Sequence, residues 1–149
     1  MIKILRTNSD DADFRDLVRL LDSELAVIDG SEHAFYSQFN KTDTIKYAIV
    51  VYDDVIPAGC GAIKEFDDLS AEIKRMFVLP GHRNKGLGSI ILAELEKWAK
   101  ELLCNRCLLE TGKRQPDAIA LYLKNGYIAI PNYGQYAGVE NSVCFEKYL

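Results

Sequence analysis

Residues 72–89, EIKRMFVLPGHRNKGLGS, join two different backbone patterns across one short glycine-containing turn. The first part has the character of a β-strand and stops at Pro80-Gly81, so we expect a strand over residues 71–79. After the turn, apolar residues recur at spacings of four, three and four, as on one face of a helix: Ile91, Leu95, Trp98 and Leu102. The stretch therefore predicts a strand that passes through a basic turn directly into a helix.

Similar patterns on either side of this stretch predict further strands and helices. We expect a helix that is capped by Asp10, Asp11 or Asp13, runs to about Ile28 and is stopped by Gly30. Residues 31–40 fit a short helix or a loop. A further helix is expected at 116–124. Further strands are expected at 2–6, 44–52, 55–66, 106–110, 127–130 and 142–148. Gly59 and Gly61 indicate a bulge or a close backbone approach. This order predicts an α/β chain with one mixed sheet and helices on both faces.

The length and charge of the chain restrict its class. With 149 residues it has the size of one ordinary domain, so we expect a single domain over residues 1–149. Its 18 basic and 22 acidic side chains give a net charge of −4, which disfavours a nucleic-acid partner. Apolar runs such as AIVVY at 48–52 are far shorter than the roughly 20 residues of a membrane span. The N-terminus lacks the apolar stretch of a signal peptide, so we expect a cytoplasmic protein.

Two of the four cysteines, Cys104 and Cys107, form a C-x-x-C pair, a spacing that also occurs in redox and zinc sites. A zinc site needs further ligands, and the two histidines, His33 and His82, lie far apart in the sequence. A redox pair sits at the start of a helix, whereas this pair follows an expected helix end. We therefore expect buried or half-buried thiols in a reducing compartment, and no metal site.

The turn at residues 81–89 has the features of an anion site. The N-terminus of a helix leaves backbone N–H groups unpaired and carries a partial positive charge. Gly86 and Gly88 allow close approach of an anion to the backbone, and Arg83 and Lys85 add charge. The Rossmann and P-loop motifs are excluded because the required third glycine and the G-x-x-x-x-G-K-[ST] spacing are missing. A plain turn that caps a helix is the alternative interpretation.

Two segments together resemble the GNAT family of N-acetyltransferases. Arg83–Gly88 matches R/Q-x-x-G-x-G/A, which binds the pyrophosphate of acetyl-CoA in that family. Residues 118–127, AIALYLKNGY, match its A-x-x-L-Y-x-x-x-G-[FY] segment. The order of strands and helices also agrees, so the resemblance covers nearly the whole chain. It implies a mostly antiparallel mixed sheet of about six or seven strands that splays apart between the strands at 71–79 and 106–110.

The resemblance also implies where acetyl-CoA binds. The pantetheine arm pairs with the strand before the turn like an added strand, which implies backbone contacts from Met76, Phe77 and Val78. A backbone N–H of this strand, which we assign to Phe77, would stabilise the oxyanion. The implied pyrophosphate contacts are Arg83, Asn84, Lys85, Gly86, Leu87, Gly88 and Ser89. Asn84 stands where arginine is common in the family, so the turn has one positive charge fewer.

The reaction implied by the resemblance is transfer of an acetyl group from acetyl-CoA to a primary amine by direct attack. An alkylammonium with a pKa near 10 must first lose a proton. Glu72 and Glu110, on neighbouring strands beside the splay, are the candidate bases, and each could instead be a rim carboxylate. Tyr122 matches the family position that protonates the leaving thiolate, although its helical spacing also fits a core tyrosine.

The acceptor pocket of the family lies between the first helical region and the loops near the C-terminus, here about Leu25–Asn40 and Pro131–Glu140. Aromatic and acidic side chains in or near these segments suit a cationic amine: Asp22, Glu24, Asp29, Tyr133, Tyr136 and Glu140. The short chain favours a small-molecule acceptor. A protein lysine or N-terminus as acceptor, a non-catalytic acetyl-CoA-binding regulatory module and a protein-interaction module are the alternatives. The resemblance also allows a homodimer.

Overall fold

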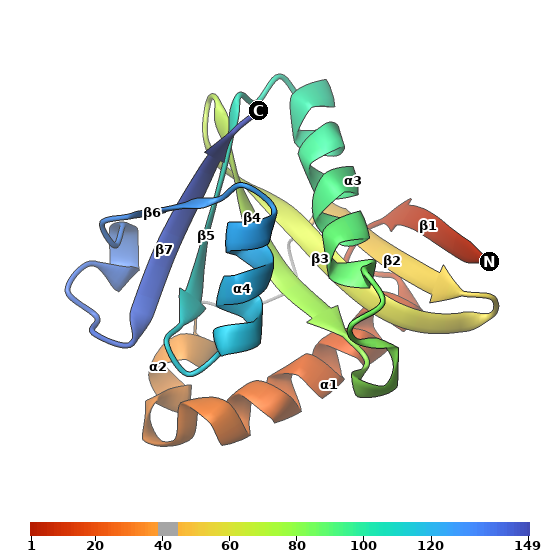
Figure 1. The fold of residues 1–149 in the computed structure, drawn as a ribbon, viewed down its shortest axis with the longest axis horizontal. Helices are drawn as coiled ribbons and strands as arrows, with labels where there is room; N and C mark the ends of the chain where they lie inside the picture. The colour runs from red at the N-terminus through yellow and green to blue at the C-terminus, as the bar shows by residue number, and fades with distance from the viewer. Residues whose placement is uncertain (39–44) are drawn as a thin grey trace.

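A single sheet of seven strands organises the chain, and helices pack on both of its faces (Figure 1). The computed structural model describes residues 1–38 and 45–149. The strands are β1 (Ile2–Thr7), β2 (Tyr47–Asp53), β3 (Ile56–Asp67), β4 (Ser70–Val78), β5 (Arg106–Gly112), β6 (Ile128–Ile130) and β7 (Ser142–Tyr148). The α-helices are α1 (Ala12–Asp29), α2 (His33–Ser37), α3 (Leu87–Glu101) and α4 (Pro116–Lys124). Short 3-10 turns are η1 (Gly30–Glu32), η2 (Pro80–His82) and η3 (Gly134–Tyr136).

The strands follow the order β1-β2-β3-β4-β5-β7-β6 across the sheet. Within the described residues, β4 and β5 run parallel and the other neighbouring strands pair antiparallel. The β4–β5 pairing is short and consists of Ser70 with Arg106, Ala71 with Cys107 and Glu72 with Leu108. Beyond these residues the two strands separate (Figure 1). The predicted mixed, mostly antiparallel sheet with a splay at this position is therefore confirmed.

A β-bulge in β4 lies beside the splay. Cys60 of β3 pairs with Phe77 and Ala62 pairs with Lys74, so Gly61 alone faces both Arg75 and Met76. Arg75 has a φ of 59°, a left-handed conformation that is uncommon outside glycine. Its side chain forms an ion pair with Asp22 of α1 and is almost completely buried. The bulge thus directs an arginine to the face of the sheet that α1 covers.

Two large apolar clusters lie on opposite faces of the sheet. On one face, α3 and α4 contribute Ile91, Leu92, Leu95 and Tyr122 to a cluster that also contains Leu109. On the other face, α1 packs against the sheet through Phe14, Leu17, Val18 and Leu21. A third, smaller cluster joins Tyr36 of α2 to Tyr136 and Cys144. The sheet is therefore covered on both faces next to the splay.

The two glycines of β3 permit the close approach that their positions predict. A Cβ atom at Gly61 would lie 2.7 Å from both the Ile91 side chain of α3 and the Met76 sulfur of β4. A Cβ atom at Gly59 would lie 3.0 Å from the Phe77 carbonyl oxygen. These glycines allow α3 to lie directly on the sheet, which fixes the position of its N-terminus.

The helix ends follow their predicted signals with one exception. The Asp11 side chain accepts a hydrogen bond from the Phe14 backbone N–H, so Asp11 is the N-cap among the three candidates, and Gly30 ends α1. Helix α4 has the predicted bounds, Pro116–Lys124. The prediction for Leu102 was wrong: it is the C-cap of α3 rather than part of its apolar face, and it is exposed. The helical period is lost there because the chain turns into β5.

Part of the sequence prediction concerns residues that lie outside the described ones. Of the strand expected at 44–52, residue 44 lies outside the described residues, residues 45 and 46 precede the strand, and β2 begins at Tyr47. Of the ambiguous segment 31–40 the structure describes residues 31–38. Those residues form η1, α2 and the residue after α2. Cys104 and Cys107 are free thiols, and burial raises the pKa of Cys107 to about 12. In the part of the chain that the structure describes, none of the helices has the length and apolar character needed to cross a membrane.

Candidate active site

A pocket of about 90 Å³ opens where β4 and β5 separate. Its walls come from α1, α2, β4, β5, α4 and the turn η3, together with Gln115 before α4. The lining residues are Leu21, Leu25, Asp29, Tyr36, Glu72, Ile73, Lys74, Arg75, Met76, Glu110, Thr111, Gly112, Gln115, Tyr122 and Tyr136. All three side chains for which we predict a catalytic role, Tyr122, Glu72 and Glu110, lie in this pocket.

The predicted anion site is the N-terminus of α3. Gly86 is its N-cap with a φ of 82°, and neither a capping side chain nor an acidic residue occupies the first turn. The Ile90 N–H donates to the Gly86 carbonyl oxygen at 3.1 Å, so the helix ladder begins there and does not use the N–H groups of Leu87, Gly88 and Ser89. Three successive backbone donors are thus available to an anion.

The two glycines of the turn have different structural roles. Gly86 has open space around it, but its positive φ favours glycine. A Cβ atom at Gly88 would lie 3.0 Å from the Leu121 side chain of α4, so this glycine allows α3 and α4 to pack closely. Asn84 has a φ of 63°, which asparagine tolerates better than most residues. The residue types of the turn therefore suit its backbone shape and its packing.

Arg83 connects the turn to the rest of the candidate site. Its Nε donates to the Val78 carbonyl oxygen at 2.8 Å, and its Nη2 donates to Glu24 of α1 at 2.8 Å. The guanidinium also lies 5.6 Å from the centre of the Phe77 ring. Lys85 is exposed at the mouth of the turn. Positive charge therefore flanks the α3 N-terminus, and Arg83 is held against β4, the strand with the expected cofactor contacts.

Met76, Phe77 and Val78 lie on the part of β4 that no longer pairs with β5. On the opposite side, Phe77 pairs with Cys60 and Val78 with Gly59 of β3. One edge of this segment is thus part of the sheet and the other faces the splay. An extended molecule can add to such an edge by backbone hydrogen bonds.

Tyr122 projects from α4 into the wall of the pocket. It is 6% exposed, and its ring packs edge-on against Tyr127 at 5.9 Å and in a tilted arrangement against Phe145 at 6.2 Å. Burial raises the pKa of its phenol above the ordinary value near 10, so the hydroxyl is protonated at neutral pH. The residue is thus both a core aromatic and a proton donor at the pocket wall.

Among the carboxyl groups that line the pocket, Glu110 of β5 has the most strongly shifted pKa. Burial raises its pKa from about 4.5 to about 7, while a hydrogen bond from Ser142 acts in the opposite direction. The Ser142 hydroxyl donates to Oε2 of Glu110 at 2.7 Å. A carboxylate with a pKa near neutral is well suited to accept a proton from an ammonium group.

Glu72, the other candidate base, has closer partners. The Tyr133 hydroxyl donates to its Oε2 at 2.6 Å, and the Lys74 ammonium lies 3.8 Å from its Oε1. Burial lowers the pKa of Lys74, and the charge of Glu72 opposes that change. These contacts tie Glu72 to the wall of the pocket, whereas Glu110 combines burial with a raised pKa.

The acceptor side of the pocket contains some predicted residues and several that we did not predict. Asp29 and Tyr136 line the pocket, and Tyr133 reaches it through Glu72. Asp22 and Glu24 are engaged with Arg75 and Arg83, and Glu140 is exposed and absent from the lining. Lys74 and Arg75 line the pocket and Ser142 reaches it through Glu110, although the sequence analysis named none of them as pocket residues. Tyr36 also lines the pocket and lies in the predicted segment Leu25–Asn40, but it was not singled out there. The sequence gives no signal for them, because their relevance depends on the bulge and on the β5–β7 register.

Comparison with known proteins agrees with this geometry. The acetyltransferase (GNAT) family profile matches residues 14–127. An IAA acetyltransferase from Azospirillum brasilense is 38% identical over 92 residues, which are 61% of this chain and 60% of that protein. The chain spans between 54% and 67% of the length of the curated relatives that it matches.

Solved structures extend the similarity over the whole chain. A crystal structure from Klebsiella pneumoniae subsp. pneumoniae, named provisionally as an acyl-CoA N-acyltransferase, has a TM-score of 0.83 at 33% identity and covers 100% of this chain and 98% of that one. A GNAT family acetyltransferase from Elizabethkingia anophelis, solved with acetyl-CoA bound, shares the fold with a TM-score of 0.70 at 19% identity, covering 99% and 98%. The profile match over most of its length shows that this chain belongs to the GNAT family of acetyltransferases.

Proposed function

We propose that this protein transfers the acetyl group of acetyl-CoA to a primary amine of a small molecule, by direct attack of the amine. The observation that carries the proposal is the joint presence of Glu110 and Tyr122 in one pocket at the splay, one suited to accept a proton and the other to donate one. The family match supports this class of reaction.

The residues on the cofactor side suit the chemistry of acetyl-CoA. The free backbone N–H groups of Leu87, Gly88 and Ser89 suit the pyrophosphate, and the free edge of β4 at residues 76–78 suits the pantetheine amides. Acetyl-CoA would supply an activated thioester. The bound acetyl-CoA of the Elizabethkingia anophelis relative supports the choice of this co-substrate.

The side chains of the pocket divide the proton transfers between them. Glu110 accepts one proton from the ammonium of the acceptor, and the freed lone pair forms the new bond to the thioester carbonyl carbon. The C–S bond breaks, and the Tyr122 phenol gives its proton to the leaving sulfur. Tyr122 regains a proton from the acylated nitrogen, and Glu110 releases the proton that it accepted to solvent. The products of the whole reaction are one amide, one thiol and one proton.

The charges of the pocket favour a cationic acceptor. Three carboxyl groups, Asp29, Glu72 and Glu110, line it together with the two basic side chains Lys74 and Arg75. Arg75 is already paired with Asp22, and Tyr36 and Tyr136 add aromatic walls. A pocket of about 90 Å³ has room for an aminoalkyl group rather than a bulky substituent. The name of the Azospirillum brasilense relative also indicates a small-molecule acceptor.

The first experiment is release of CoA thiol from acetyl-CoA across a panel of polyamines, amino acids, aminoglycosides, arylalkylamines and short peptides. We expect turnover with one class of small amine, and loss of that turnover in Glu110→Gln. Glu65→Gln, an exposed carboxylate of β3, is the matched control. A reaction without amine corrects for the four cysteines.

The other outcomes contradict the proposal in identifiable ways. Turnover with peptides alone would identify a protein lysine or N-terminus as the acceptor. No turnover together with a melting temperature that rises with acetyl-CoA would identify a non-catalytic acetyl-CoA-binding module. An unchanged melting temperature in the presence of acetyl-CoA would remove acetyl-CoA itself from the proposal.

A further inference from the structure

A chain of hydrogen bonds leads away from Glu110 toward α2. The Ser142 hydroxyl of β7 donates to Oε2 of Glu110 at 2.7 Å. The hydroxyl groups of Tyr36 and Ser142 are 3.1 Å apart, and the contact is buried. Nδ2 of Asn141 donates to the Tyr36 hydroxyl oxygen at 3.2 Å. Four side chains from β5, β7, α2 and the residue before β7 thus form one continuous network.

The direction of each bond in this network follows from the number of protons available. A hydroxyl group has one proton to donate, and an ionised carboxylate can only accept. Since Ser142 gives its proton to Glu110, the Tyr36 hydroxyl must be the donor to Ser142. Asn141 then donates to the oxygen of Tyr36. Every proton in the network therefore points toward the carboxylate.

This arrangement of hydrogen bonds requires that Oε2 of Glu110 carries no proton. A proton on that oxygen would have to be donated to Ser142, and Ser142 would then donate to Tyr36. The Tyr36 proton would in turn need an acceptor, which requires the Asn141 amide to reverse its orientation. Protonation of Oε2 thus requires three neighbouring groups to reorient together.

We propose that Tyr36 and Ser142 are positioning residues that hold Glu110 as an oriented carboxylate able to accept the proton of the acceptor ammonium. Ser142 acts on Glu110 directly, and Tyr36 acts through Ser142. The proposal rests on the proposed function insofar as Glu110 is the base of an acetyl transfer. It adds that α2, a helix of the acceptor side, is coupled to that base by hydrogen bonds rather than by packing alone.

Other groups around Glu110 also affect its protonation. Asp29 of α1 and Glu72 of β4 favour its protonated form, and Lys74 of β4 favours the ionised form. Tyr122 of α4, Tyr136 of η3 and Cys144 of β7 also face Glu110, and burial raises their pKa values, which keeps them neutral near pH 7. Burial itself raises the pKa of Glu110 to about 7, and the bond from Ser142 opposes that effect. Removal of the network should therefore raise the pKa further.

The test is a direct titration of the Glu110 side chain by carbon NMR of protein labelled at the glutamate carboxyl carbons, with Glu110→Gln to assign the signal. We expect Ser142→Ala to raise the pKa of Glu110 by about one unit and Tyr36→Phe by about half as much. The acidic limb of the kcat/KM profile should move to higher pH by the same amounts. Tyr52→Phe is the control, because it removes a tyrosine–carboxylate bond of 2.6 Å to Asp13 outside the pocket.

The two readouts separate the failure of this inference from the failure of the proposed function. An unchanged pKa of Glu110 in Tyr36→Phe, which retains the ring in the third cluster, would overturn the inference even if Ser142→Ala does not fold. A raised pKa without a shift of the rate profile would support the network and overturn Glu110 as the base. A shift of equal size in Tyr52→Phe would show a general effect of stability and would also overturn the inference.

Discussion

The two halves of the candidate active site are built from different parts of the polypeptide. The cofactor half uses the backbone: the N–H groups of the α3 N-terminus and the free edge of β4. The acceptor half uses side chains that come from α1, α2, β4, β5 and α4. A backbone site requires a particular chain shape, whereas a side-chain site requires particular residue types at positions distant in the sequence. Substitutions in the two halves should therefore affect different kinetic parameters.

The largest expected effect is in the acceptor half, at Glu110. Glu110→Gln removes the base but retains the size of the side chain. We expect kcat/KM for the amine to fall by about 10²–10⁴-fold, the usual contribution of a positioned base. The acetyl-CoA Kd, measured by calorimetry, should not change. A fall of less than threefold would show that another group removes the proton.

Tyr122→Phe is expected to have the next largest effect. The ring packs against Tyr127 and Phe145 and remains in the variant, while the proton for the leaving sulfur is lost. We expect kcat to fall by more than about tenfold with little change in acetyl-CoA affinity. Pre-steady-state and steady-state measurements of thiol release would give the change in kcat. Unaltered turnover would remove Tyr122 from the mechanism and leave it as a core residue.

A substitution at Gly86 should affect the cofactor half alone. Alanine at a φ of 82° is strained by about 1–2 kcal/mol, so the turn must move or the free N–H groups must shift. We expect the Kd of acetyl-CoA to rise by about tenfold, with little change in kcat at saturation. Gly81→Ala is the matched control, because Gly81 also has open space but lacks a positive φ. Equal effects of the two substitutions would contradict a backbone site.

The division between the two halves also separates what could be predicted from the sequence from what could not. The backbone shape of the cofactor half was predictable because strand, turn and helix start are adjacent in the sequence, and the positive φ of Gly86 is a local feature of the turn. The order of elements and the bounds of α4 were predictable for the same reason. The sequence alone proposed both Glu72 and Glu110 as bases, and their different surroundings appear only once Tyr133 and Ser142 are in place.

The residues that the sequence analysis missed all depend on non-local contacts. Arg75 enters the pocket because a bulge in β4 changes the direction of its side chain. Tyr36 and Ser142 are 106 positions apart, and the register of β7 against β5 pairs Ser142 with Gly112, two residues from Glu110. A strand pattern with a period of two gives no indication of a bulge, and no local pattern records a register. Such residues require the structure.

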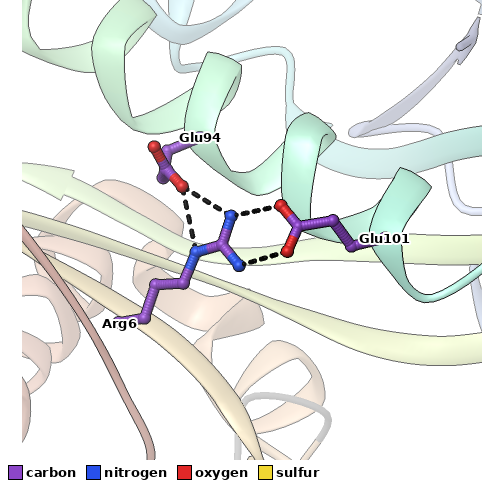
Figure 2. A network of polar contacts seen from close by, with 3 residues as sticks. All are labelled: Arg6, Glu94 and Glu101. Atoms are coloured by element: carbon purple, nitrogen blue, oxygen red, sulfur yellow. Dashed lines mark hydrogen bonds and ion pairs between the residues drawn. The ribbon is translucent and has the colours of Figure 1, made fainter.

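The smallest expected effect lies outside both halves, in the ion pairs of Arg6. Its guanidinium contacts Glu94 at 2.7 Å and Glu101 at 2.8 Å, both on α3 (Figure 2). The group also lies 4.7 Å from the centre of the Trp98 ring. Because these groups are partly exposed, Arg6→Ala should cost about 1 kcal/mol of unfolding free energy or less, with both kinetic parameters unchanged. Urea denaturation would measure it, with Arg19→Ala as the exposed control.

The short pairing of β4 with β5 has a consequence for the stability of different regions. Strands β1 to β4 form one set of adjacent antiparallel strands and β5 to β7 form another, and among the described residues three backbone pairs join the two sets. This short junction in the middle of the sheet is also the place where the candidate catalytic side chains meet. We expect amide hydrogen exchange to be fastest, within the sheet interior, for residues beside this junction, and to slow when acetyl-CoA is added. A ligand that bridges the junction would thus add to the cohesion of the fold, so that substrate occupancy and resistance to local unfolding increase together.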